Sequence, residues 1–89
     1  MAVFIHPRVH DRHPEISDDD ARTAWEQAIR SAPRSATPNM WVTVGTDRRG
    51  RLIELVARSN AEGDWLVFHA MTPPSSKTLT ELGLRRSRR

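Results

Sequence analysis

The chain has 89 residues, of which 14 are basic and 11 acidic, and its formal net charge is +3. It contains no cysteine, which excludes a disulfide framework and a cysteine metal cluster. No apolar run approaches the roughly 20 residues of a membrane span, and Met1–Ile5 is far too short for a secretory signal, so we expect a cytoplasmic protein.

The first residues predict an arm followed by a short helix. Ala2–His6 is apolar and suits an edge strand or a packed arm. Pro7 is favourable at the start of a helix, and Pro14 ends one, so a mostly exposed helix is predicted over Pro7–His13.

A second helix has the clearest local signal in the chain. Ser17 is a favourable N-cap, three aspartates follow it, and Asp20 stands in the capping-box position. We predict a helix over Asp18–Ser31, followed by an extended connector over Ala32–Asn39. Its apolar residues recur at helical spacing and are expected to face the core: Ala21, Ala24, Trp25, Ala28 and Ile29.

Three apolar runs then predict an antiparallel meander. They cover Met40–Val44, Arg51–Ser59 and Trp65–Met71, each of ordinary strand length. The polar loops between them contain glycines that are expected to supply positive φ: Gly45, Gly50 and Gly63.

The end of the chain predicts a short helix and a basic tail. The helix covers Lys77–Leu82, is capped by Thr72 or Ser75, and stops at Gly83. Four arginines within residues 85–89 predict a disordered tail.

Residues 1–84 therefore predict one small α+β domain with helices on one face of an antiparallel sheet. The sheet is a three-stranded meander, with room for one extra edge strand. The long helix is expected to cover four apolar residues: Ile53, Leu55, Phe68 and Leu79. The three tryptophans are expected to anchor the core rather than to stack on bases.

The four histidines comprise three near the start of the chain and one, His69, within the third apolar run. His6, His10 and His13 have helical spacing, but no carboxylate or cysteine pattern completes a metal ligand set, so we expect no metal or other cofactor. His69 lies inside a strand, where a neutral imidazole serves either in proton transfer or in structure.

Arginines near the meander are suited to phosphate contacts. Arg51, Arg58 and the loop pair Arg48-Arg49 are expected to be the ordered positive groups. The candidates for RNA binding are Arg48, Arg49 and Lys77. A solvated strand edge explains the same pattern. Whether Arg58 and His69 share a surface depends on the register of the second hairpin, which the sequence leaves open.

The order Arg12-His13-Pro14, the Ser17-capped helix, VTVGTDRRGRLIELVA and WLVFHA resembles the BrnT-like branch of the RelE/ParE toxin superfamily. The resemblance covers residues 12–84. It implies a RelE-like fold and a metal-independent mRNA endoribonuclease, acting on or off the ribosome. It also implies a bacterial type II toxin that is held inactive by an antitoxin protein encoded beside it. The resemblance allows the toxin to form a homodimer or a hetero-oligomer with this antitoxin.

Within this resemblance, Arg51 matches a "GR" arginine and His13 matches a histidine before the second helix. The third strand departs from the family pattern, because Met71 stands where many relatives have arginine. The leading hypothesis is an RNA endonuclease with His69, Arg51 and Arg58 as catalytic residues and His13 as a further candidate. The alternative is a non-catalytic protein-interaction domain of the same fold.

Overall fold

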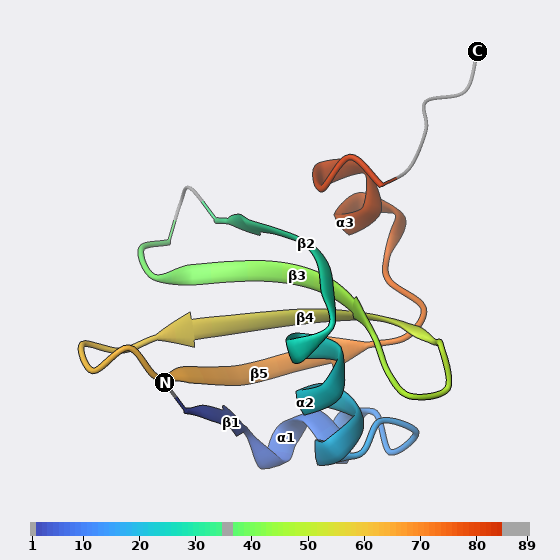
Figure 1. The fold of residues 1–89 in the computed structure, drawn as a ribbon, viewed down its shortest axis with the longest axis horizontal. Helices are drawn as coiled ribbons and strands as arrows, with labels where there is room; N and C mark the ends of the chain where they lie inside the picture. Colours follow the sequence, from blue (N-terminus) through green and yellow to red (C-terminus); the bar gives the residue numbers. More distant parts are fainter. Residues whose placement is uncertain (1, 35–36, 85–89) are drawn as a thin grey trace.

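The computed structural model describes residues 2–34 and 37–84, so the predicted tail at residues 85–89 lies outside the described part (Figure 1). The elements in chain order are β1 (Val3–Ile5), α1 (Pro7–Arg12), α2 (Asp18–Glu26), β2 (Ala28–Pro33), β3 (Met40–Thr46), β4 (Leu52–Ser59), β5 (Trp65–Met71) and α3 (Ser76–Glu81). No helix in the described ranges is long and apolar enough to cross a membrane.

One mostly antiparallel sheet of five strands runs in the order β1-β5-β4-β3-β2. The predicted meander is present as β3, β4 and β5. The one extra edge strand for which the sequence left room is present as β1, which pairs parallel to β5. The fifth strand, β2, was not predicted and pairs antiparallel to β3. These added strands form the two edges of the sheet (Figure 1).

Helix α2 begins as predicted but ends earlier. The Ser17 side chain accepts from the Asp20 backbone N–H, and the Asp20 carboxylate accepts from the Ser17 N–H, which completes the capping box. The predicted extension to Ser31 is wrong, because Ala28–Pro33 pairs with β3. Ile29 is therefore 52% exposed instead of facing the core.

Gly45 has a different role from the one predicted. Gly50 and Gly63 have positive φ of 82° and 83°, as expected for turn glycines. Gly45 lies inside β3, and a Cβ there would overlap the carbonyl oxygen of Ala24. The glycine is needed because the end of α2 approaches the β3 backbone so closely.

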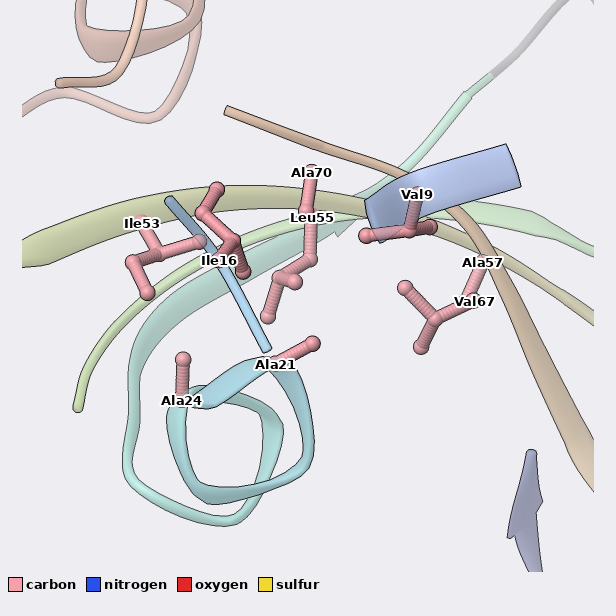
Figure 2. Close-up of a cluster of buried hydrophobic side chains, with 9 residues drawn as sticks. All are labelled: Val9, Ile16, Ala21, Ala24, Ile53, Leu55, Ala57, Val67 and Ala70. Carbon is pink, nitrogen blue, oxygen red and sulfur yellow. The ribbon is translucent and has the colours of Figure 1, made fainter. Parts of the chain in front are cut away.

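Apolar side chains pack on both faces of the sheet. The first core joins α1, α2 and the sheet and contains Val9, Ile16, Ala21, Ala24, Ile53, Leu55, Ala57, Val67 and Ala70 (Figure 2). The second contains Val42, Val44, Val56 and Leu82, with Phe68 and Leu79 packed against it. We call these sides the α2 face and the α3 face. The prediction that all helices share one face, with α2 covering Phe68 and Leu79, is wrong.

A β-bulge in β5 determines on which face of the sheet the side chains of this third meander strand lie. Ala57 pairs with Val67 and Val56 pairs with His69, so Phe68 is an extra residue. Strict alternation is interrupted. As a result, His69 lies on the α3 face together with Phe68, and Arg58 shares that face.

The three tryptophans gather at one end of the α2 face. The ring centroids of Trp25 and Trp65 are 5.2 Å apart, and those of Trp41 and Trp65 are 6.4 Å apart. Trp25 and Trp65 are partly buried and pack against the first core. The prediction that the tryptophans anchor the core is therefore confirmed for Trp25 and Trp65.

Candidate functional site

A pocket opens at the edge of β5 where β1 ends. Strand β1 pairs only with Trp65–Val67, and beyond this point α1 lies against β5. The pocket between them has a volume of about 310 Å³. Its charged and titratable lining residues are Arg8, Arg12, His13, Arg34, Glu54 and His69.

His69 and Glu54 form a hydrogen-bonded pair in this pocket. His69 Nε2 lies 2.9 Å from Glu54 Oε2, and the Glu54 side chain is only 7% exposed. The other carboxylate oxygen, Oε1, accepts from both the backbone N–H and the hydroxyl of Ser75, each at 3.0 Å. Glu54 thereby connects β5 to the N-terminus of α3.

Glu54 is ionised at neutral pH despite its burial. Burial by itself would raise the pKa of this carboxyl, but hydrogen bonds from Ser75, Thr78 and His69 outweigh it and lower the pKa. An ionised carboxylate accepts hydrogen bonds only. His69 Nε2 therefore carries the hydrogen, and Nδ1 becomes the acceptor of the ring.

His13 brings a second imidazole to the same pocket. It is the C-cap residue of α1, and its ring is perpendicular to that of His69 with centroids 6.4 Å apart. Its Nδ1 lies 3.5 Å from Glu15 Oε2. Two histidines that are 56 positions apart in sequence thus face one small space.

Three arginines line the pocket together with the two histidines. Arg8 and Arg12 come from α1, and Arg34 follows β2. Arg34 Nη1 lies 3.9 Å from Glu81 Oε1, while its buried Nε finds no hydrogen-bond partner among the residues that the structure describes. The lining thus holds three cations, one of them paired with Glu81, and one buried carboxylate, which makes the pocket suitable for an anion.

Arg51 lies on the other face of the sheet. Its Nε donates to Asp47 Oδ2 at 2.7 Å, and its Nη2 donates to Asp20 Oδ2 at 3.1 Å. Burial would raise the pKa of Asp47, but hydrogen bonds from Arg51 and Arg49 lower it. Arg51 therefore holds the β3–β4 loop against α2, and the structure does not bring it to His69.

The remaining predicted residues lie outside the pocket. Arg48 and Arg49 are exposed and pair with Asp19 and Asp20 at the start of α2. Arg58 lies over the Phe68 ring, 5.4 Å from its centroid. Lys77 lines a groove of about 880 Å³ that shares Arg34 and Val56 with the pocket.

Sequence reasoning missed Glu54 and the arginines at positions 8, 12 and 34. The sequence could have indicated Glu54 as a candidate, because it is an acidic residue inside an apolar strand run. Arg8 and Arg12 are four residues apart and so share a helix face. Arg34 had no comparable signal.

The three N-terminal histidines do not converge. His6 Nδ1 accepts from the Arg8 N–H, and His10 Nδ1 bonds to the Ile16 carbonyl. In the described ranges, no three His, Asp or Glu side chains are grouped to hold a metal ion. Comparisons with protein-family models, with curated proteins and with solved structures found no match.

Proposed function

We propose that this protein is a metal-independent endoribonuclease whose active site is the pocket between α1 and β5. The observation that carries the proposal is the meeting of His13 and His69, beside the ionised Glu54, in a space bordered by three arginines. Two imidazoles supply a base and an acid, and guanidinium groups bind phosphate.

The reaction is a transesterification at one phosphodiester. His69 Nδ1 takes the proton of the ribose 2′-hydroxyl, and the oxygen attacks the adjacent phosphorus. The bond from phosphorus to the 5′-oxygen breaks, and His13 as imidazolium donates the proton to that leaving oxygen. The products are a 2′,3′-cyclic phosphate and a 5′-hydroxyl, so protons and bonds balance.

Glu54 and the arginines support these proton transfers. The Glu54 carboxylate orients His69 and stabilises the imidazolium that it becomes. Arg8, Arg12 and Arg34 stabilise the negative charge on the phosphoryl oxygens. They supply the charge that the toxin resemblance would expect at position 71, where this chain has methionine.

In a wider proposal, the protein is the toxin of a bacterial type II toxin–antitoxin system with a RelE-like fold. The antiparallel meander with a Ser17-capped helix against it supports this reading. Such a protein acts in the cytoplasm and is neutralised by a protein encoded beside it.

The test uses a labelled RNA oligonucleotide and the purified protein. Wild type should release a 2′,3′-cyclic phosphate and leave a 2′-deoxy substrate intact. His69→Ala and His13→Ala should each lower the cleavage rate by about 10²- to 10⁴-fold. His10→Ala, a histidine outside the pocket, should change it less than threefold.

Two results would contradict this assignment. Equal cleavage by wild type and His69→Ala would remove the pocket from the reaction. No cleavage by wild type, together with a stable complex with the product of the neighbouring reading frame, would favour the protein-interaction domain. Induced expression gives a second readout, in which wild type but not His69→Ala should arrest growth.

A further inference from the structure

The α3 face carries a row of side chains outside the pocket. Phe4 of β1 pairs with Leu66 of β5, and Leu66 pairs with Arg58 of β4. Residues paired directly across strands project from the same face of a sheet. Phe4 is 54% exposed and Leu66 is 37% exposed, so this row presents apolar area to solvent.

Phe68 joins this row to the pocket. Its ring lies under the Arg58 guanidinium and also forms part of the pocket wall beside His69. The β5 bulge places Phe68 and His69 on one face, where strict alternation would separate them. We name Phe4, Leu66, Arg58 and Phe68 the stacking surface.

We propose that the stacking surface binds an unpaired nucleobase of the RNA, next to the phosphate held in the pocket. This inference rests on the proposed function and identifies a base of the RNA substrate that the protein contacts outside the pocket. Aromatic rings and guanidinium planes stack on bases of any sequence. In a duplex both faces of a base are covered, so the surface selects single-stranded RNA.

Charge favours RNA over a protein as the occupant. The ionisable groups of the stacking surface and the adjoining pocket are four arginines, two histidines and one buried glutamate. An RNA strand brings a phosphate for these cations with every base that it stacks. An apolar protein segment would match Phe4 and Leu66 alone.

The experiment measures binding of a labelled, non-cleavable 2′-O-methyl hexanucleotide by fluorescence anisotropy. Phe4→Leu keeps apolar area but removes the aromatic face, and it should raise Kd about tenfold. Phe4→Trp should bind at least as tightly as wild type. Ile29→Ala is the matched control, since Ile29 is 52% exposed on the opposite edge strand and its replacement should leave Kd unchanged.

A mutant cycle tests the contact itself. Removing the base at one position of the hexanucleotide should also raise Kd about tenfold. When this base is already missing, Phe4→Leu should raise Kd by less than a further twofold, because the contact is already lost. An unchanged Kd for Phe4→Leu would overturn the inference. It would also be overturned if, at every position of the hexanucleotide, the increases in Kd from Phe4→Leu and from base removal multiplied as independent effects. Weaker binding of a protein partner by Phe4→Leu, with RNA affinity intact, would overturn it too.

The binding and cleavage experiments test the stacking surface and the proposed function separately. The hexanucleotide is not cleaved, so its Kd does not depend on His13 or His69 chemistry. Coupling between Phe4 and one base without RNA cleavage would contradict only the proposed function. RNA cleavage by wild type without such coupling would contradict only the stacking surface.

Discussion

Single residues decide how closely α2 can approach the sheet. Ala21 and Ala24 face the sheet and are fully buried (Figure 2). Gly45 lies beneath the last turn of the helix, near the Ala24 and Gln27 carbonyl oxygens. Small side chains on both partners keep the contact short, and this leaves no space for even one added methyl group.

Gly45→Ala should therefore lower the free energy of unfolding by about 3 kcal/mol, the upper range for an overfilled site. The obstacle is backbone, which cannot rotate away. Urea denaturation measures the change. Gly50→Ala is the control: its Cβ would meet nothing within 4 Å, and only its φ of +82° opposes the change, at about 1 kcal/mol. Equal losses in the two variants would contradict the close approach.

At the scale of elements, the ends of α2 follow different rules. Its start is local, because Ser17 and Asp20 satisfy one another within one turn. Its end is set by distant residues, because the chain leaves the helix at Gln27 and joins β3. The start is therefore sensitive to a single side chain, whereas the end depends on strand pairing.

Ser17→Ala should lower the free energy of unfolding by about 1 kcal/mol, since it leaves the Asp20 N–H without its capping oxygen. Thermal unfolding followed by far-ultraviolet circular dichroism measures the loss. Thr80→Ala, an exposed hydroxyl residue in α3, should change the melting temperature little. A Ser17 variant as stable as the Thr80 variant would show that the cap does not hold the helix.

At the scale of the whole molecule, buried and partly buried carboxylates attach helices to the sheet on both faces. On the α3 face, Glu54 accepts from Ser75 at the start of α3. On the α2 face, Asp47 and Asp20 share Arg51. The pKa of each of these three carboxyls is lowered in the folded protein.

Stability should consequently fall in acid. A carboxyl whose pKa is lower in the folded state stabilises it above the unfolded-state pKa, and loses this effect as the pH falls through the folded-state pKa. The melting temperature should be level above about pH 5 and fall below about pH 4. Glu54→Gln should be less stable at pH 7 but show a shallower fall, whereas exposed Glu62→Gln should follow wild type. A Glu54→Gln curve parallel to wild type would contradict the role of Glu54.

Local chemistry accounts for the features that the sequence determined by itself. The capping box at Ser17, the turn glycines Gly50 and Gly63 and the three apolar runs each depend on neighbours within a few residues. These rules sufficed to predict the α+β class and the meander. His69 became a candidate through its place inside an apolar strand run, whereas His13 became one only through the resemblance to the toxin family.

Tertiary structure decided what depends on residues distant in sequence. Pairing with β3 turned Ala28–Pro33 into a strand although its apolar spacing suited a helix. The bulge at Phe68 re-aimed His69 toward the buried Glu54. Only the folded sheet brings α1, β4 and β5 together into one pocket, because cross-strand hydrogen bonds, which no local spacing encodes, set the register and the bulge.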